Sequence, residues 1–391
     1  ASLALTTGAV LLVGALGRRW LGPKLGVAAA LLVAVNPVLV SYSHWVLSEA
    51  PFVFLVLLSL YAFQRAGEGQ GAVPDRWGWI GLATAAAAFL TRTAGLPLLL
   101  AAVLHPALSR RWRRTGVAAA VVLATAGGWA LFQRLGAPGQ AGYLSELLMV
   151  NPYDPAAGQV GLAGLLGRTA ENFWRYVSDV LPLSVTGGRG TGGTVAAAGG
   201  LGLAALAAAG WLRRSLEGVG PAELFLFLYL GLICAWPSVW TDRRFLLPAL
   251  PLLLLYGVEG ARAAGRALAE GGETSGLGAA RLGVPLLLAG FVLGPGLLDA
   301  ARTAPERLRC LAGWRSGSPC VPAAYARFYS AAEWVAGNTP EDAVVVNRKP
   351  RLFYWVSGRR GDLYPYSSEP TVVLTAIEEM GADYVVVDAI S

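Results

Sequence analysis

Long apolar runs separated by short polar loops dominate the first 300 residues of the chain. A membrane-spanning helix needs about 20 mostly apolar residues. Ten segments approach that length: 1–17, 25–42, 50–64, 78–91, 95–108, 116–134, 195–212, 222–240, 245–261 and 283–300. The pattern predicts a polytopic α-helical membrane protein of about ten spans.

The apolar stretch from 78 to 108 carries an arginine, Arg92, near its middle. Gly95 and Pro97 follow it, and both weaken the continuation of a helix. A charge at the centre of a bilayer costs roughly 2.5–3.5 kcal/mol on insertion scales, so an intramembrane arginine is a candidate functional residue. We therefore divide the stretch into two spans, in preference to one bent helix.

Basic residues are distributed unequally between alternate short loops. If the loop at 18–24 is cytoplasmic, the loops on its side carry Arg18, Arg19, Lys24, Arg65, Arg76, Arg110, Arg111, Arg113, Arg114, Arg213, Arg214, Arg262, Arg266 and Arg281. The short loops of the opposite side carry only Arg92, Arg243 and Arg244. Because Lys and Arg concentrate in cytoplasmic loops, this imbalance sets the orientation. It also supports the break at Arg92, since a merged span would reverse the later clusters.

The orientation assigns two larger regions to the outside of the cytoplasm. One is the loop 135–194 within a membrane domain of 1–300. The other is a domain of 301–391 that ends abruptly, which we interpret as an incomplete domain. Helical spacing in 162–181 indicates an amphipathic helix, either lying on the membrane surface or packed on the outer domain. In the tail, helices at 323–337 and 370–380 and β-branched runs at 343–346 and 384–387 indicate a small α/β domain.

The composition agrees with a membrane protein. The 391 residues are 55% hydrophobic and 14% charged, whereas soluble domains carry about 25% charged residues. The net charge of +7 lies mostly in short loops, where it orients the chain, so nucleic acid is not an expected partner. The sequence has no glycine-rich phosphate loop and no dinucleotide fingerprint. An enzyme acting at the outer face would take its activated group from a membrane-borne donor.

The cysteines and the first residue give two further expectations. Cys310 and Cys320 fall in the outer domain, where an oxidising compartment makes a disulfide plausible, with two free thiols as the alternative. No metal-ligand spacing is present, and the need for a divalent metal stays open. The chain starts at Ala1 inside an apolar run, which we interpret as a missing N-terminal span and outer loop.

Polar residues gather at the outer ends of the spans. Glu49 and His44 lie between the second and third spans, Arg92 follows the fourth, and Arg243 and Arg244 precede the ninth. Each has an ordinary explanation. Glu49 could cap a helix, His44 could be an interfacial histidine, and the arginines could reach to the headgroups. Arginines on this side nevertheless oppose the orientation signal, and guanidinium groups suit phosphate. Together these residues indicate a site for a lipid-linked phosphate.

At this point the chain resembles the GT-C membrane glycosyltransferases, which include protein O-mannosyltransferases and the aminoarabinose transferase of lipid A. Each motif is weak alone, but their order covers nearly the whole chain. The matching segments are 17–19, 36–37 with 42–44 and 46–49, 90–96, 151–154, 244–251, 332–334 and 339–342.

The resemblance implies an integral protein of the bacterial cytoplasmic membrane with its active site outside. Such an enzyme transfers a sugar from polyprenyl phosphate to a hydroxyl of a lipid, glycan or protein, with inversion. Its catalytic base would lie before Ala1, so this stretch alone would be inactive. Glu49 would match the second acid of the family, with Arg92 and Arg244 as phosphate contacts. His44 is a further catalytic candidate beside Glu49, Arg243 is a further candidate contact to the donor phosphate, and Tyr42 and Asp242 are possible supporting side chains.

Two other functions remain as alternatives. A transporter or lipid flippase would place its polar residues near the middle of the membrane, within an inverted repeat. A non-catalytic membrane protein could instead bind cell-wall components through its outer domain. Transfer from a labelled polyprenyl-phosphate sugar, compared with glycan binding by the tail, separates these functions.

Overall fold

The computed structural model shows a helical chain that divides into two compact units. It describes residues 1–43, 47–66, 73–136, 143–153, 157–187, 194–270, 289–295, 297–298, 300–305, 309, 323–365 and 369–387. The first unit comprises Ala1–Met149 with Gln159–Ala301, and the second comprises Val150–Gly158 with Arg302–Ser391. A short piece of the loop predicted for the membrane domain, Val150–Gly158, therefore groups with the C-terminal unit.

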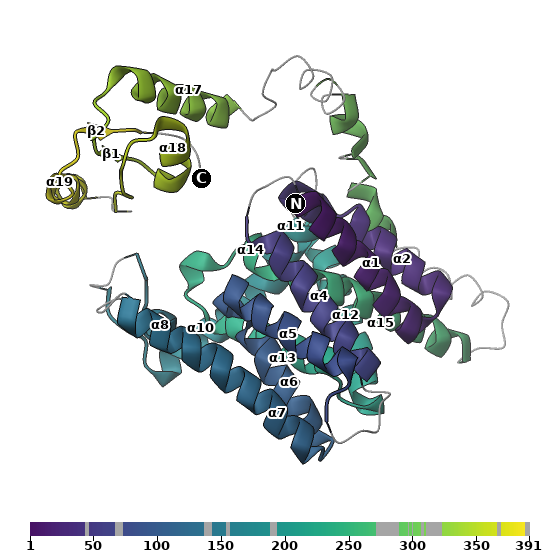
Figure 1. Ribbon diagram of the computed structural model, residues 1–391. Coiled ribbons are helices and arrows are strands. Elements are labelled where there is room, and N and C mark those ends of the chain that lie inside the picture. Colours follow the sequence, from purple (N-terminus) through teal and green to yellow (C-terminus); the bar gives the residue numbers. More distant parts are fainter. Residues whose placement is uncertain are drawn as a thin grey trace. The chain divides into compact units, whose positions relative to one another are not determined.

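The first unit is built of α-helices (Figure 1). In chain order they are α1 Ser2–Leu21, α2 Pro23–Ala34, α3 Pro37–Tyr42, α4 Glu49–Ala66, α5 Arg76–Thr91, α6 Leu96–Leu108, α7 Trp112–Val122, α8 Gly128–Gly136, α9 Tyr143–Leu148, α10 Leu162–Arg175, α11 Leu181–Thr186, α12 Thr194–Glu217, α13 Pro221–Ala235, α14 Arg243–Leu246 and α15 Leu250–Glu270. Two π-helical turns, Leu123–Gly127 and Tyr176–Val180, join α7 to α8 and α10 to α11.

The helices follow most of the predicted spans, and two predicted spans are interrupted. The span 25–42 is divided into α2 and α3 because Pro37 opens a new helix, and the Asn36 side chain accepts hydrogen bonds from the backbone N–H groups of residues 38 and 39. The span 245–261 is likewise divided into α14 and α15. Of the tenth span, 283–300, the structure describes residues 289–295, 297–298 and 300, which are helical.

The predicted break at Arg92 is confirmed, and it reverses the chain. α5 ends at Thr91, Arg92 is extended with φ −150° and ψ 129°, and α6 begins at Leu96. Leu82 of α5 and Ala102 of α6 belong to one buried cluster, although the break separates them. A Cβ on Gly95 would lie 2.8 Å from the Phe89 Cα. The two helices therefore form a hairpin in which glycine allows the backbones to meet.

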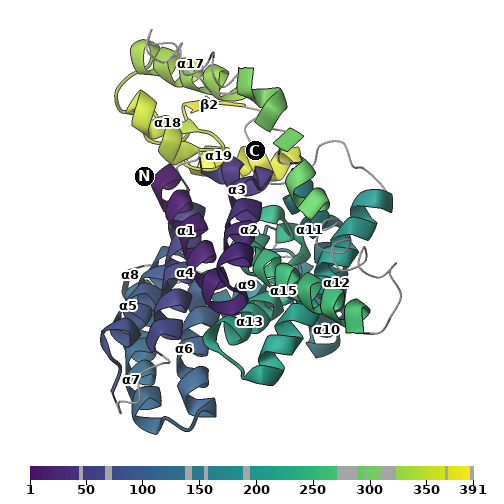
Figure 2. The same ribbon diagram turned by 90° about the vertical axis from the view of Figure 1, so that its right-hand side faces the viewer.

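Close contacts between helix backbones hold the rest of the first unit together. A Cβ on Gly210 of α12 would collide with the carbonyl oxygen of Tyr256, and one on Gly260 of α15 with that of Leu206. Figure 2 shows α12 beside α15. Small residues at such crossings are typical of helix packing in membranes. Tyr229 and Tyr256 are among the largest fully buried side chains.

Two helices of the described residues are long and apolar enough to cross a membrane, Glu49–Ala66 and Trp112–Gly136. The second forms a long rod from α7 and α8 (Figure 1), and its leucines are exposed, with Leu123 at 73% and Leu135 at 76%. Apolar side chains that face outward along a whole helix suit a lipid environment. Shorter apolar helices occur at Pro23–Ala34, Thr93–Leu108 and Pro221–Ala235. The number of ten spans stays a prediction.

The outer-loop helix predicted at 162–181 is present as α10, which continues through the π-helical turn into α11. It packs on α13 of its own unit: the Asn172 amide donates hydrogen bonds to the carbonyl oxygens of Cys234 (2.9 Å) and Trp236 (2.8 Å). Phe173 and Trp174 remain exposed, at 57% and 58%. The buried face of this helix therefore packs within its own unit, and contact of the exposed face with a membrane surface or with the outer domain stays a prediction.

The second unit contains α17 Ala323–Asn338, β1 Val345–Val346, α18 Pro350–Ser357, α19 Pro370–Glu379 and β2 Tyr384–Val385. The two strands are parallel and pair Val345 with Tyr384. Phe328 of α17 packs edge-on against Phe353 of α18, with ring centroids 5.4 Å apart. The predicted helices and β-branched runs are thus present, while α18 was not predicted. Residues 150–153 of the same unit include an Asx turn, in which Asn151 accepts from the Tyr153 N–H.

Candidate functional site

Glu49 is the centre of the candidate site. It opens α4 and is buried, with 2% of its surface exposed. Its Oε1 atom forms ion pairs with both Arg92 Nη1 and Arg244 Nε. Residues that are 43 and 195 positions away in the sequence therefore meet at one carboxylate oxygen. One negative charge faces two positive charges, so this group of three side chains carries a net positive charge.

Arg92 reaches Glu49 because the chain reverses at its own position. The extended backbone between α5 and α6 points its side chain toward the start of α4, where Nη1 also donates a hydrogen bond to Ser48 Oγ at 3.2 Å. Its guanidinium carbon lies 6.0 Å from the centroid of the Phe245 ring. The side chain is 17% exposed. Arg92 is thus held on three sides and largely shielded from solvent.

Arg244 comes from the short helix α14. Asp242 precedes this helix and its Oδ1 accepts a hydrogen bond from the Arg243 N–H at 2.6 Å. Tyr229 of α13 also holds α14 in place, because its hydroxyl donates a hydrogen bond to the Phe245 carbonyl oxygen at 2.8 Å. The Arg244 side chain is 43% exposed. Arg244 therefore holds Glu49 with one edge of its guanidinium group and keeps the remainder accessible.

The other predicted site residues are placed differently. The side chains of Asp242 and Arg243 are exposed (59% and 42%) and form a long ion pair with each other at 4.0 Å. Among the described residues, Arg243 makes no ion pair with Glu49. Tyr42 lines a small cavity together with Glu49 and Thr6. His44, Cys310 and Cys320 lie outside the described residues, so the possible disulfide stays a prediction.

The second carboxylate oxygen of Glu49 differs from the first in its contacts. Oε2 is buried and has no hydrogen-bond partner among the described residues. A buried carboxylate oxygen without a donor costs free energy of about 1–3 kcal/mol or more, so its position is notable. The oxygen is available to a hydroxyl or cation that enters the site. Within the part of the chain that the structure describes, no three His, Cys, Asp or Glu side chains gather into a metal-binding group.

Several residues that position the site were not predicted from the sequence. Ser48 and Phe245 are direct neighbours in sequence of Glu49 and Arg244, so their role could have been inferred from adjacency. Tyr229 lies within a predicted span, where a hydroxyl in an apolar run is a usable signal. Asn172 also accepts a hydrogen bond from Thr241 Oγ1 at 3.0 Å, and so fixes the segment just before α14. Its role depends on a contact across 69 residues that no local pattern reveals.

One family model matches the N-terminal third of the chain. Residues 1–133 match the family model described as dolichyl-phosphate-mannose-protein mannosyltransferase. This segment includes Glu49 and Arg92 and ends before Arg244. No curated protein sequence matches the chain.

Two solved structures of one protein resemble the chain over nearly its whole length. Crystal structures of ArnT from Cupriavidus metallidurans match in the apo state (14% identity, 99% of this chain and 74% of that chain, TM-score 0.49) and bound to undecaprenyl phosphate (15% identity, 98% and 74%, TM-score 0.51). The second match shows a shared fold. With the family model, it confirms the resemblance to the GT-C membrane glycosyltransferases that the sequence motifs indicated.

Proposed function

We propose that the protein is an integral membrane glycosyltransferase that moves a sugar from polyprenyl phosphate to an acceptor hydroxyl. The observation that carries the proposal is the meeting of Glu49, Arg92 and Arg244 at the ends of apolar helices. Two guanidinium groups at one point suit a phosphate, which they bind by charge and in bidentate geometry. The match of the first 133 residues to a mannosyltransferase family model supports the same chemistry.

In the proposed reaction the acceptor oxygen attacks the anomeric carbon of the sugar and loses its proton to a general base. The bond between that carbon and the phosphate oxygen breaks, and polyprenyl phosphate leaves with the bonding electron pair. The configuration at the anomeric carbon inverts. Cations that face the leaving oxygen stabilise the charge that develops there. Arg244, with its accessible guanidinium edge, and Arg92 fill this role.

Glu49 has a positioning role in this proposal. Its Oε1 holds both arginines in place, while Oε2 has no hydrogen-bond partner among the described residues. A bound phosphate then meets two guanidinium groups that are already oriented, which lowers the cost of organising the site. Tyr42, Asp242 and Arg243 remain further candidates, and so does His44, which lies outside the described residues. We assign the site to the extracytoplasmic face of a bacterial inner membrane, following the distribution of basic loops.

Donor binding tests the proposal directly. Purified protein in detergent is titrated with undecaprenyl phosphate, and the dissociation constant is compared for Arg92→Gln, Arg244→Gln and the wild type. Loss of one charged hydrogen bond, about 1.5–3 kcal/mol, predicts roughly 10- to 100-fold weaker binding. Arg134→Gln is the matched control, because Arg134 is an exposed arginine of α8 on the same predicted side and away from the site.

Transfer from a labelled polyprenyl-phosphate sugar completes the test, with the full coding region expressed in membranes. We expect Glu49→Gln to lower the transfer rate more than it lowers donor affinity. Binding without transfer would favour a lipid transporter. Equal donor affinity in the two arginine variants and in the Arg134→Gln control would overturn the proposal.

A further inference from the structure

Helix α10 is amphipathic, but its apolar side faces outward and its polar side faces the protein. A helix on the surface of a soluble protein turns its apolar side to the core and its polar side to water. In α10 the buried side chains are Arg168 and Asn172. The exposed apolar side chains are Leu162 (76%), Leu166 (63%), Phe173 and Trp174. The surroundings of this helix are therefore expected to be apolar.

The buried polar side of α10 fixes how the helix is rotated about its own axis. Arg168 donates hydrogen bonds to the carbonyl oxygens of Leu147 and, at 2.8 Å, of Met149. Asn172 donates to the carbonyl oxygen of Trp236, which follows α13. These contacts would be lost if the helix turned its apolar side inward, and buried carbonyl groups would lose their donors. The outward direction of the apolar side is thus set by specific hydrogen bonds.

Helix α10 packs on α13 at the point where the apolar sequence of α13 ends (Figures 1 and 2). α13 is one of the shorter apolar helices of the chain. The rings of Trp236 and Trp240 stack just beyond its last residue, with centroids 6.0 Å apart. Arg175 of α10 reaches the same turn, where Nη1 donates to the Ser238 carbonyl oxygen at 3.3 Å. Because tryptophans gather where apolar helices leave the membrane, this contact indicates the level of a membrane–water interface.

The length and the charges of α10 favour a helix that lies in the interface over one that crosses the membrane. It has 14 residues, fewer than the roughly 20 that a span needs, and its continuation α11 is mostly buried. Glu171 is exposed. At 100° per residue it lies about 160° around the helix from Phe173. One edge of the helix therefore suits water, while the apolar side suits lipid.

From these observations we propose that the outward side of α10 binds the surface of a lipid bilayer. The side chains of Leu162, Leu166 and Phe173 enter the boundary between headgroups and acyl chains, and the Trp174 ring lies at the headgroups. Lipid fits this side better than a protein partner because the side adjoins the tryptophan pair at the end of an apolar helix. The proposal does not depend on the glycosyltransferase function.

Spin labels on α10 test the proposal, because oxygen concentrates in hydrocarbon and a nickel chelate stays in water. The full chain, with Cys310→Ser and Cys320→Ser, is placed in nanodiscs of phosphatidylcholine and phosphatidylglycerol, and Cys234 is buried. Nitroxide labels are attached one at a time to Leu166→Cys, Phe173→Cys and Glu171→Cys. We expect the ratio of oxygen to nickel collisions to be roughly fivefold higher or more at residues 166 and 173 than at residue 171. Residue 171 is the matched control, since it is an exposed position of the same helix.

Three results would overturn the inference. A ratio as low at residues 166 and 173 as at residue 171 would place the apolar side in water. Few collisions with either reagent at residues 166 and 173 would show that protein covers this side, either the C-terminal unit or a second copy of the chain. Frequent oxygen collisions at all three positions would place the whole helix inside the hydrocarbon. The labels replace exposed side chains, so the hydrogen bonds of Arg168 and Asn172 stay in place.

Discussion

The two arginines that share Glu49 should contribute unequally to stability. Arg92 is 17% exposed and Arg244 is 43% exposed, while Glu49 is almost fully buried. Water screens an ion pair more strongly when one partner is accessible. We therefore expect the coupling between Glu49 and Arg92 to exceed the coupling between Glu49 and Arg244, although both arginines contact the same oxygen atom.

The magnitudes follow from burial. A hydrogen bond to a charged group contributes about 1.5–3 kcal/mol when it is shielded, which is the range expected for the coupling with Arg92. An exposed pair contributes about 0.2–1 kcal/mol, and Arg244 should fall near the upper end. Removal of Glu49 alone should destabilise the protein by about 3–5 kcal/mol, because it leaves buried positive charge without a partner.

Double-mutant cycles measure these couplings. Glu49→Gln, Arg92→Gln and Arg244→Gln are made singly and in pairs with Glu49→Gln. The free energy of unfolding is then measured by denaturant titration in mixed micelles. A cycle of Glu49→Gln with Arg243→Gln is the control and should give a coupling near zero. A coupling to Arg244 equal to or larger than that to Arg92 would refute the argument from burial.

Three further predictions concern packing and redox state. Asn172→Ala should destabilise the protein by about 3 kcal/mol in the same titration, because it leaves two buried carbonyl groups without a donor; a loss below about 0.5 kcal/mol would contradict the hydrogen-bond assignment. Gly95→Ala should cost about 1–3 kcal/mol, since its Cβ would lie 2.8 Å from the Phe89 backbone, and unchanged stability would show that the hairpin has room there. Cys310 and Cys320 should resist alkylation until a reductant is added, as measured by mass spectrometry after expression in an oxidising compartment; labelling of both without reductant would show free thiols.

The sequence predicted those features of the fold that depend on residues close together along the chain. Gly95 and Pro97, two residues that disfavour a continuing helix, mark the reversal after Arg92, and the unequal distribution of basic loops required the same reversal. Arg92 and Arg244 were singled out because they oppose the orientation signal. That argument depends on the free energy needed to place a charged side chain in the membrane, which a partner of opposite charge offsets. Glu49 was singled out by its place at the same outer ends and by the family resemblance, whereas its ion pairs with both arginines were not predicted.

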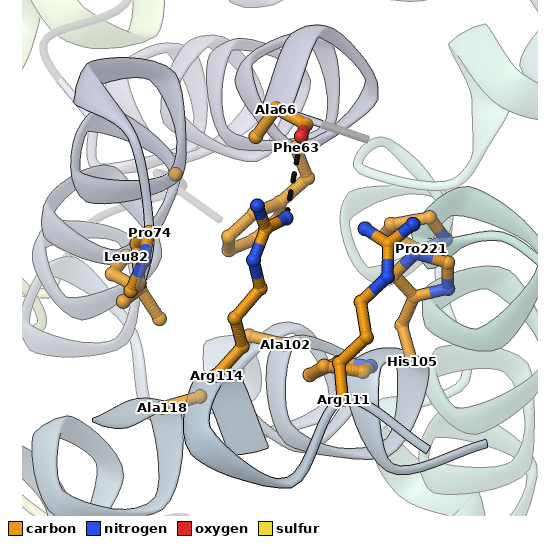
Figure 3. A pocket seen from close by; sticks show the side chains of 12 residues that line it. Phe63, Ala66, Pro74, Leu82, Ala102, His105, Arg111, Arg114, Ala118 and Pro221 are labelled. Atoms are coloured by element: carbon orange, nitrogen blue, oxygen red, sulfur yellow. Dashed lines mark hydrogen bonds between the residues drawn. The ribbon is translucent and has the colours of Figure 1, made fainter. Parts of the chain in front are cut away.

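Other features depend on contacts that sequence patterns do not contain. The division of 25–42 into α2 and α3 was signalled by Asn36 and Pro37, but the apolar run around them concealed it. The buried contacts of Asn172 join segments that are distant in sequence, and nothing local distinguishes this asparagine from a solvated one. The burial of Arg114 was hidden for a related reason, because in the sequence it looks like one of several orientation charges, and only the folded chain brings it to the Ala66 carbonyl oxygen at the end of α4 (Figure 3).

The glycine crossing of α12 and α15 has a mechanical consequence. With Gly210 and Gly260 at the crossing, main chain lies directly on main chain, and there are no side chains whose rotamers could absorb a displacement. Helices α12 and α15 should therefore move together as one rigid body. If the protein binds the proposed polyprenyl donor, any rearrangement has to occur elsewhere, and we expect it at the π-helical turn Tyr176–Val180.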